Sequence, residues 1–348
     1  MFGRRSEGAG AADLGWCYDA VDDVSRTFAI TIDELDPPVA DAICVGYLLC
    51  RVPDTIEDTR RVPPEEKVAL LETYGDALDP DDETTIEAFV DDATPFAPDD
   101  PTPHWEVVVE AGRIVDTYRS LPDETRTCLL GPIRELVGGM ATYVDRYADT
   151  GGLRIETVEE LEDYCWYAAG TVGTLMTNLL ARGADEETRG VMCDTARSFG
   201  LLLQLVNIAK DVAADYHEEN NVYLPADWLR EVGVSQEAVA EADNAPAVAG
   251  VIGRVVDRAT GYLDDAQAWL EVVPERDGNT LAACAIPFML AVATLRELDR
   301  RPEDVIREGG LKIERSEVYA IISRFHEGVA RDELGSLRER IAAEPLHR

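Results

Sequence analysis

Lysine is the scarcest charged residue in this chain of 348 residues, with three copies: Lys67, Lys210 and Lys312. The other basic residues are arginines, and 32 Lys and Arg against 69 Asp and Glu give a formal net charge of −37. So acidic a chain lacks the basic footprint that nucleic-acid binding needs, and it disfavours adhesion to an anionic membrane surface. An acid excess with so little lysine is typical of a protein from a high-salt cytoplasm, such as that of a haloarchaeon, where salt screens self-repulsion. The alternative is an ordinary acidic protein.

Histidine, paired cysteines and long apolar runs are also rare or missing. With four histidines and no C-x-x-C pair among seven cysteines, the sequence offers no zinc site of the usual kind. The cysteines lie mostly in apolar context, as the buried reduced thiols of a cytosolic protein do. No apolar signal segment begins the chain, and the longest uncharged run, 164–181, carries polar residues that favour a buried core helix over a membrane span. We therefore expect a cytoplasmic protein without a transmembrane anchor.

Helical signals run along the whole chain, without the sustained period-2 alternation that indicates strands. The expected helices cover 36–58, a stretch from 63 onward, 105–118, 124–147, 157–180, 186–216, 246–272, 280–298 and 316–341. No abrupt change of composition and no long linker divides the chain, so we predict one all-α domain over 1–348 with a motif-bearing core at 20–330. Residues 1–15 and the acidic, proline-bearing loop 91–103 are expected to be disordered.

Acidic residues gather within an apolar segment at 47–58. Asp54 and Asp58 are four residues apart and share a helix face, with Glu57 beside them. Like charges in this arrangement repel unless something neutralises them. Hard divalent cations are the natural partner, because Mg²⁺ binds a few carboxylates together with water and phosphate oxygens.

A second acidic stripe lies at 207–215. Asn207, Asp211 and Asp215 recur every four residues along one helix face, after a strongly apolar stretch. A polar stripe that enters a core needs partners. Two such clusters on facing helices would hold Mg²⁺ and a diphosphate between them. The alternative is that both clusters are solvated acidic faces.

Five blocks of sequence, taken in order, resemble the squalene/phytoene synthase family of head-to-head prenyl transferases. The blocks are 25–28, 47–58, 164–173, 200–215 with 222–225 behind it, and 284–295 with 311–315 trailing it. The first acidic motif, Asp-Thr-Ile-Glu-Asp, is similar to the squalene synthase branch of the family. The Val-Tyr-Leu-Pro at 222–225 is similar to the phytoene synthase branch.

The resemblance implies the all-α isoprenoid synthase fold with a central active-site cavity. It also implies Mg²⁺, two farnesyl diphosphates as substrates, presqualene diphosphate as intermediate, and NADPH for reduction to squalene. One alternative is the same coupling without reduction, which gives dehydrosqualene or phytoene. A second, of another class, is a non-catalytic acidic helical binding protein. We expect at most a peripheral membrane contact for product release, and the sequence leaves the oligomeric state open.

The resemblance also assigns roles to residues. The metal and catalytic carboxylate set is Asp54, Glu57, Asp58, Asp211 and Asp215, with Asn207 in support. The contacts to diphosphate and substrate are Ser25, Arg26, Phe28, Tyr47, Arg51, Gln204, Asn207 and Lys210. Tyr164 takes the base or proton-relay role, and Tyr167, three residues on, is its rival.

Cofactor binding is assigned by resemblance to Lys312 and Arg315, which correspond to a segment linked to NADPH phosphates. Glu314 stands between them where the family has arginine, which weakens that assignment. The turn at 216–221 lacks a firm cation, so no contact with diphosphate is assigned to it. Gly170 and Gly173 are expected to allow the close approach of a chain or of substrate.

Overall fold

The structure, a computed structural model, describes residues 11–276 and 278–347, and within them it is helical without a β-strand. The helices are α1 (Ala11–Val24), α2 (Arg26–Asp33), α3 (Val39–Asp58), α4 (Pro64–Leu78), α5 (Ile86–Ala93), α6 (Pro103–Val109), α7 (Ala111–Ser120), α8 (Asp123–Arg146), α9 (Val158–Cys165), α10 (Thr171–Leu180), α11 (Glu186–Ala214), α12 (Ala226–Glu231), α13 (Ala245–Thr260), α14 (Leu263–Val272), α15 (Thr280–Arg300), α16 (Asp304–Arg307), α17 (Arg315–His326) and α18 (Leu334–Ala343). Two π-helical turns, Trp166–Gly170 and Asp215–Glu219, extend from α9 and α11. The predicted all-α fold is confirmed.

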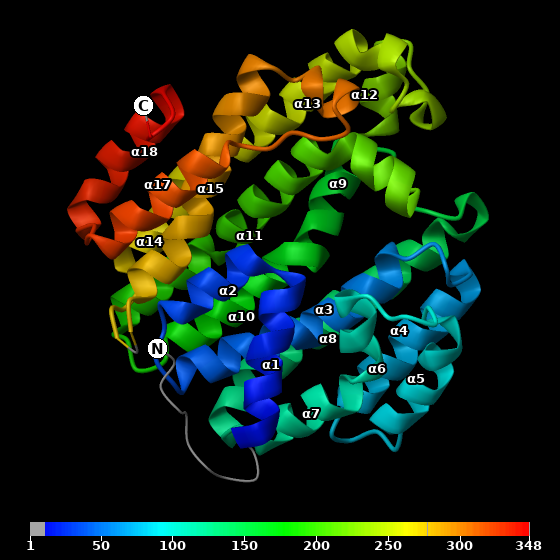
Figure 1. Cartoon of the computed structure of the whole chain (residues 1–348), viewed down its shortest axis with the longest axis vertical. Helices are drawn as coiled ribbons and strands as arrows, with labels where there is room; N and C mark the ends of the chain where they lie inside the picture. Colours follow the sequence, from blue (N-terminus) through cyan, green and yellow to red (C-terminus); the bar gives the residue numbers. More distant parts are fainter. Residues whose placement is uncertain (1–10, 277, 348) are drawn as a thin grey trace.

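Two apolar cores stabilise one helical array. The first is formed mainly by α1 to α8, and the second mainly by α9 to α18, while α10 contributes side chains to both. Figure 1 shows the blue and cyan helices at one end of the molecule and the yellow and red helices at the other, with green helices between them. The two cores lie on either side of a central cavity, as expected for a single large helical domain.

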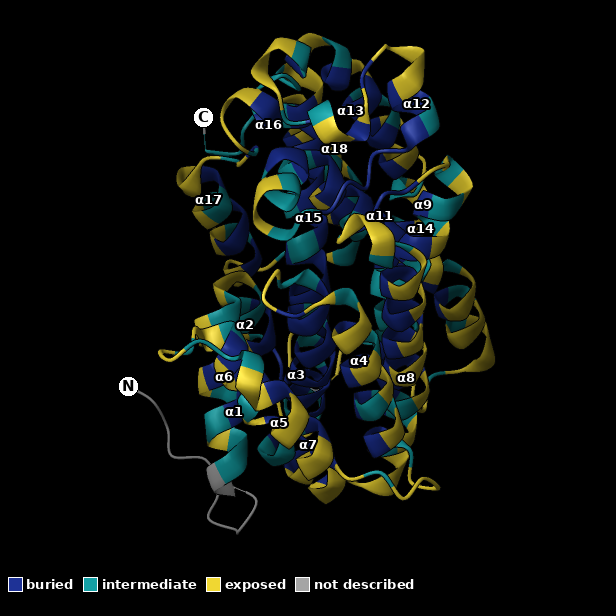
Figure 2. Cartoon of the chain, turned by 90° about the vertical axis from the view of Figure 1, so that its right-hand side faces the viewer, coloured by how far each residue is buried: buried dark blue, intermediate teal, exposed yellow. Residues whose placement is uncertain are grey.

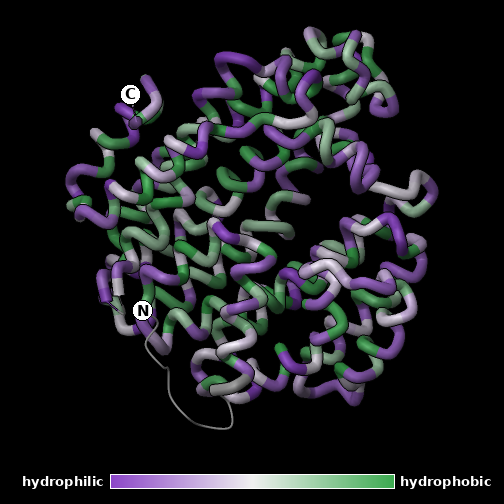
Figure 3. Tube along the Cα trace, viewed as in Figure 1, coloured by the Kyte–Doolittle hydropathy of each residue, from purple (hydrophilic) through white to green (hydrophobic). Residues whose placement is uncertain are grey.

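The burial pattern follows the amphipathic sequence of each helix. Figure 2 shows α3 and α15 as largely buried, whereas α5 and α7 turn exposed faces outward. Figure 3 shows hydrophobic turns running through the centre of the array and hydrophilic turns around it. One described helix, α15, is long and apolar enough to cross a membrane, but 83% of its apolar window is buried inside the protein. It is therefore the core helix of a folded domain.

Three predicted helices are each divided in two. Residues 105–118 form α6 and α7, 246–272 form α13 and α14, and 316–341 form α17 and α18. The break between α17 and α18 occurs at Gly328, two residues after the end of α17, where a left-handed φ of 96° ends the helical conformation. Apolar periodicity continues across such a short break, because both helices pack on the same core.

The stretches predicted to be disordered are partly helical. Residues 1–10 lie outside the described part, and residues 11–15 begin α1. The segment 91–103 holds the end of α5, a 3₁₀ turn and the start of α6. The Thr102 hydroxyl caps α6 by accepting a hydrogen bond from the Trp105 N–H at 3.4 Å. This stretch is therefore more regular than the sequence predicted.

Glycines allow α11 to lie very close to the α9–α10 segment. A Cβ added to Gly173 would lie 2.4 Å from the carbonyl oxygen of Ala196, and one added to Gly200 would lie 2.3 Å from that of Ala169. The close approach expected at Gly173 is therefore that of a neighbouring helix. This contact fixes the position of α11, which carries the second acidic motif.

Gly200→Ala is expected to lower the free energy of unfolding by about 2–3 kcal/mol, since its new methyl group would overlap rigid backbone. Chemical denaturation measures the change. Gly190→Ala is the matched control on the same helix, because nothing lies within 4 Å of its Cβ position. A loss for Gly200→Ala no greater than that of the control would contradict the packing argument.

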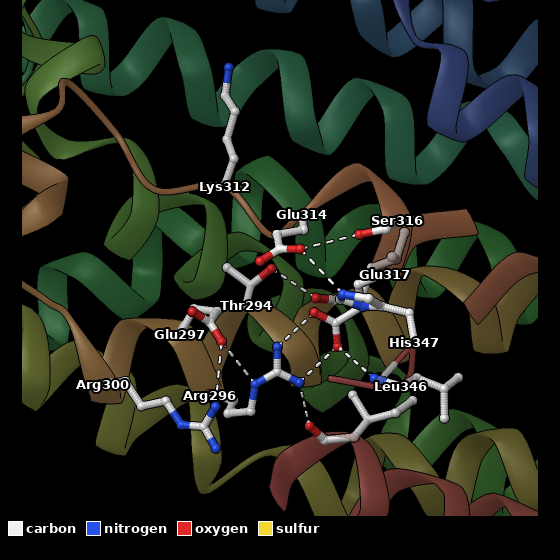
Figure 4. Close-up of polar contacts among 12 residues, drawn as sticks. Thr294, Arg296, Glu297, Arg300, Lys312, Glu314, Ser316, Glu317, Leu346 and His347 are labelled. Atoms are coloured by element: carbon white, nitrogen blue, oxygen red, sulfur yellow. Dashed lines mark hydrogen bonds and ion pairs between the residues drawn. The ribbon is translucent and has the colours of Figure 1, made fainter. Parts of the chain in front are cut away.

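A buried ion pair joins the helices of the C-terminal third. The Arg296 guanidinium donates to both carboxylate oxygens of Glu317, at 2.8 and 2.7 Å, and to the Ile341 carbonyl at 2.7 Å. Both charged side chains are at most 3% exposed. Figure 4 shows this cluster together with the end of the chain, where Leu346 N–H also donates to Glu317.

Glu317→Ala is expected to cost about 3–5 kcal/mol, because it leaves the Arg296 charge buried without its bidentate partner. Glu303→Ala, which breaks an exposed pair with Arg307, should cost less than about 1 kcal/mol. Denaturant midpoints of the two variants test the difference. Equal midpoints would show that Glu297, the other carboxylate that pairs with Arg296, is sufficient to stabilise the buried Arg296 charge.

Candidate active site

A cavity of about 390 Å³ opens between the two cores. Its wall combines the C-terminal half of α3, the middle and end of α11, and shorter contributions from α8, α9, both π-helical turns and the segment after the second turn. The lining residues are Arg51, Asp54, Glu57, Asp58, Met140, Tyr164, Ala168, Gln204, Asn207, Ile208, Lys210, Asp211, Asp215, Glu219 and Tyr223. Every residue predicted as a metal ligand therefore faces one space.

The first acidic motif occupies the last turns of α3, which continues through Pro53 to Asp58. Burial is the main cause that raises the pKa of Asp54, to about 7, and repulsion from Asp58 adds to it, while Arg51 opposes it. Arg51 pairs with Asp54 at 3.5 Å, and its Nε donates to Nδ1 of His104 at 3.1 Å. Burial and the Arg51 charge both lower the pKa of His104, so that its ring accepts this bond as the neutral form.

Glu57 is the most enclosed carboxylate of the first motif, at 2% exposure. Its Oε2 accepts a hydrogen bond from the Tyr164 hydroxyl at 3.2 Å, whereas its Oε1 is buried with no hydrogen-bond partner among the described residues. Burial, then repulsion from Asp58 and Asp54, raises the pKa of Glu57 well above its usual value. Lys67, buried on α4, donates to the Glu57 carbonyl oxygen and offsets part of this repulsion.

The second acidic motif lies at the end of α11, and Asp215 begins the π-helical turn that follows. Helix α11 begins where the Asp185 carboxylate accepts a hydrogen bond from the Thr188 N–H at 2.8 Å. At the other end of the helix, Lys210 forms an ion pair with Asp211. Burial raises the pKa of Asp215 to about 8, with further contributions from Asp211 and from Asp58 of the first motif. The two predicted motifs thus repel each other across the cavity, which is the arrangement that a cation would relieve.

These carboxylates fit a cation that is bound by the protein and by a phosphate group of the substrate at the same time. Among the described residues, no three His, Cys, Asp or Glu side chains lie close enough together to hold a metal ion unaided. Mg²⁺ usually binds one or two carboxylates and completes its shell with water and phosphate oxygens. The unpartnered Oε1 of Glu57 and the opposed acids on α3 and α11 fit that kind of binding.

The structure separates the two tyrosines that the sequence left as rivals. Helix α9 begins where the Thr157 hydroxyl accepts from the Glu160 N–H at 3.2 Å, and it carries the buried Tyr164 into the cavity. The Tyr164 hydroxyl lies 3.3 Å from that of Tyr223 and donates to Glu57. Tyr167 packs on α8, where a Cβ on Gly139 would come within 2.2 Å of its ring, and it does not line the cavity.

The predicted substrate contacts at the start of α2, together with Tyr47 on α3, do not line the cavity. The Ser25 hydroxyl caps α2 by accepting from the Phe28 N–H at 3.4 Å, and Arg26 is exposed. The Phe28 ring stacks on Tyr47 with centroids 4.2 Å apart, and Tyr47 lies one turn before Arg51 on α3. Of the other predicted substrate contacts, Arg51 lines the cavity, as do Gln204, Asn207 and Lys210 from α11.

The predicted cofactor residues lie on a segment that runs along α11. The Leu311 N–H donates to the Lys210 carbonyl at 2.8 Å, which places Lys312 near the end of the second motif. Lys312 and Arg315 are exposed, do not line the cavity, and form no ion pair within the described part of the chain. Glu314, the acid between them, contacts Ser316 and His347, and Figure 4 shows Lys312 extending away from it.

Sequence reasoning missed five lining residues: Met140, Ala168, Ile208, Glu219 and Tyr223. Met140, Ala168 and Ile208 add apolar surface. Tyr223 belongs to the Val-Tyr-Leu-Pro block, so its place in a recognised motif was an available signal. Glu219 lies in the turn that lacked a firm cation, and it brings a carboxylate instead.

Comparison of the sequence with known proteins identifies related enzymes. The sequence model of the family described as Squalene/phytoene synthase matches residues 21–317. The squalene synthase ERG9 of Candida albicans is 31% identical over 326 residues, which cover 92% of this chain and 69% of that protein. The squalene synthase of Homo sapiens is 26% identical, over 90% of this chain and 69% of its own length.

Solved structures show the same fold. A complex of TcSQS with a ligand superimposes with a TM-score of 0.75 at 23% identity, covering 95% of this chain and 98% of that one. A dehydrosqualene synthase with ligand gives a TM-score of 0.53 at 18% identity and covers 96% of both chains. The expected isoprenoid synthase fold is thereby confirmed. Because the family match extends over most of its length, the chain belongs to the squalene/phytoene synthase family of transferase enzymes.

Proposed function

We propose that this enzyme is a squalene synthase, which joins two farnesyl diphosphates head-to-head through presqualene diphosphate and reduces the product to squalene. One observation carries the proposal: two acidic motifs on α3 and α11 face each other across one cavity, with the Tyr164 hydroxyl between their walls. The squalene synthases of Candida albicans and Homo sapiens, which match this chain, support the choice of reaction.

The proposed metal ligands are the cavity acids Asp54, Glu57, Asp58, Asp211 and Asp215, with Asn207 in support. When bound, Mg²⁺ supplies the positive charge that makes diphosphate a better leaving group. Arg51 and Lys210, cations at either side of the cavity, orient the phosphate groups. Met140, Ala168 and Ile208 provide the apolar wall that holds a prenyl chain and excludes water from the allylic carbon.

Tyr164 then handles the proton of the first half-reaction. Loss of the donor diphosphate leaves an allylic cation, the double bond of the second farnesyl chain attacks it, and loss of a proton closes the cyclopropane. The Tyr164 hydroxyl relays that proton: its oxygen takes the proton up as its own hydroxyl proton passes to a basic acceptor, either the Glu57 carboxylate to which it is hydrogen-bonded or the released diphosphate. Its aromatic face also stabilises the adjacent cation.

Lys312 and Arg315 are the proposed contacts for the phosphates of NADPH. Their fit rests on chemistry. In a strongly acidic protein, both are exposed cations that form no ion pair with a carboxylate among the described residues, and their segment runs next to Lys210. NADPH would supply the hydride that reduces the rearranged cation. Glu314, which lies between the two cations in sequence, contacts Ser316 and His347.

A second candidate is the same coupling without reduction. It is favoured by the Val-Tyr-Leu-Pro block at 222–225, by Glu314, and by the structural likeness to a dehydrosqualene synthase. The non-catalytic binding protein is disfavoured, because burying so many acids around one cavity has a cost that a binding surface would not need.

Incubation with farnesyl diphosphate and Mg²⁺, with and without NADPH and at low and high salt, separates the candidates. Squalene that forms only with NADPH is the expected result, with presqualene diphosphate accumulating in its absence. A C40 product from geranylgeranyl diphosphate, with none from farnesyl diphosphate, would contradict the proposal. The absence of product from either substrate would favour the non-catalytic alternative.

A further inference from the structure

The turn that follows α11 is held in one conformation by contacts outside the acidic motifs. After the π-helical turn Asp215–Glu219, Asn220 adopts a left-handed φ of 66°. Its backbone and side-chain oxygens both accept from the guanidinium of Arg154, and its Nδ2 donates to the carbonyls of Thr150 and Gly151 at 3.2 and 3.1 Å. These contacts with Arg154 and with the 150–151 backbone hold Asn220 in place, and they thereby constrain the residue before it, Glu219.

That preceding side chain is Glu219, which points into the cavity between the two acidic motifs. Its Oε2 accepts a hydrogen bond from Asn221 Nδ2 at 3.3 Å, and it has no ion pair among the described residues. Burial is the main cause that raises the pKa of Glu219, to about 9, and repulsion from Asp58 on α3 and from Asp215 at the start of the same π-helical turn adds to it. Glu219 therefore shares the cavity with carboxyl groups of both motifs, and among the described residues its hydrogen-bond donor is the neutral amide of Asn221.

Two further observations indicate a ligand at this point. Glu57, on the same wall, is 2% exposed and leaves its Oε1 without a hydrogen-bond partner in the described structure. Glu219 also continues the four-residue spacing of Asn207, Asp211 and Asp215. Four oxygen-bearing side chains thus follow one another along α11 and its π-helical extension.

We propose that Glu219 is a further carboxylate ligand of the divalent cations that hold the diphosphate, acting between Asp58 and Asp215. This inference rests on the proposed function, and it adds a ligand from a turn to which the sequence assigned none. Cations bound there, with diphosphate oxygens completing their coordination, would offset the repulsion among the acids at the end of α3 and in the π-helical turn after α11.

The experiment measures binding of Mn²⁺, a paramagnetic substitute for Mg²⁺, to the full-length protein in the presence of inorganic diphosphate. Electron paramagnetic resonance titration gives the stoichiometry and affinity. Glu219→Gln, which keeps the size of the side chain, is expected to lose one bound ion or to weaken binding by at least about tenfold. Glu218→Gln is the matched control, because Glu218 is the residue before Glu219 in sequence, its side chain is exposed, and it does not line the cavity.

Thermal unfolding without divalent ions provides a second measurement. Glu219→Gln should melt at or above the temperature of the unmodified protein, since it removes an ionisable carboxyl group from a site where burial and repulsion disfavour its charged form. It should also show a smaller rise in melting temperature when Mn²⁺ and diphosphate are added. Glu219→Asp retains the carboxyl group on a shorter side chain. Its affinity for Mn²⁺ should lie between that of the unmodified protein and that of Glu219→Gln.

The outcomes distinguish this inference from the proposed function. Wild-type Mn²⁺ affinity and stoichiometry in Glu219→Gln would overturn the inference, as would an equal loss in Glu218→Gln or a melting temperature that falls without metal. Asp211→Asn tests the proposed site itself. If that variant also binds Mn²⁺ and diphosphate normally, the proposed function fails, whereas a loss confined to Asp211→Asn would remove only Glu219 from the ligand set.

Discussion

Asp211→Ala and Asp54→Ala are each expected to reduce the turnover of farnesyl diphosphate by about a thousandfold, the loss typical when one stabiliser of developing charge is removed. Each residue supplies a carboxylate from one side of the cavity, and diphosphate cannot leave readily unless its negative charge is neutralised. The fold should survive, because burial and repulsion already disfavour the ionised form of Asp54.

The measurement is the rate of diphosphate release at saturating Mg²⁺, with thermal unfolding as the check on folding. Asp194→Ala is the control, since Asp194 is an exposed acid on the same helix as Asp211 and lies outside the cavity. It should retain full activity. Near-normal turnover by either Asp54→Ala or Asp211→Ala would show that the metal assignment on that helix is wrong.

Tyr164→Phe is expected to slow the formation of presqualene diphosphate by about 10²–10⁴-fold, the range for loss of a positioned proton-transfer group. The variant keeps the ring and removes the hydroxyl that lies 3.2 Å from Glu57 and 3.3 Å from the Tyr223 hydroxyl. Assays without NADPH isolate this first half-reaction. Tyr167→Phe should be nearly as active as the unmodified enzyme, because Tyr167 packs against Gly139 on α8.

Binding data decide what a slow Tyr164→Phe enzyme means. If Mn²⁺ and diphosphate bind normally, the hydroxyl acts on the proton, as proposed. If their binding falls together with the rate, the role of Tyr164 is to orient Glu57, to which it donates a hydrogen bond. A larger loss in Tyr167→Phe than in Tyr164→Phe would show that the relay has been assigned to the wrong tyrosine.

The acidic motifs could be predicted from the sequence because their geometry is local. In a helix, residues four apart share a face, so Asp54 with Asp58, and Asp211 with Asp215, had to point the same way once α3 and α11 formed. The apolar residues around them indicated that these faces turn inward. The structure places all four in one cavity.

Other parts of the site depend on contacts between distant segments. His104 accepts from Arg51 across 53 positions, and Lys67, the lysine to which the sequence assigned no role, reaches the carbonyl of Glu57 from another helix. No pattern within α3 indicates either partner. The same holds for the hydroxyl contact between Tyr164 and Tyr223, which are 59 positions apart.

The sequence by itself determined the helical class, the family-like blocks and the faces on which the acids lie, since each depends on residue types at short spacing. The tertiary structure decided which faces meet. It turned Tyr164 rather than Tyr167 into the cavity, brought Glu219 between two motifs, and placed Lys312 beside Lys210. The physical reason is that helix periodicity acts over a few residues, whereas the docking of α3 against α11 depends on apolar surfaces and glycine contacts contributed by many segments at once.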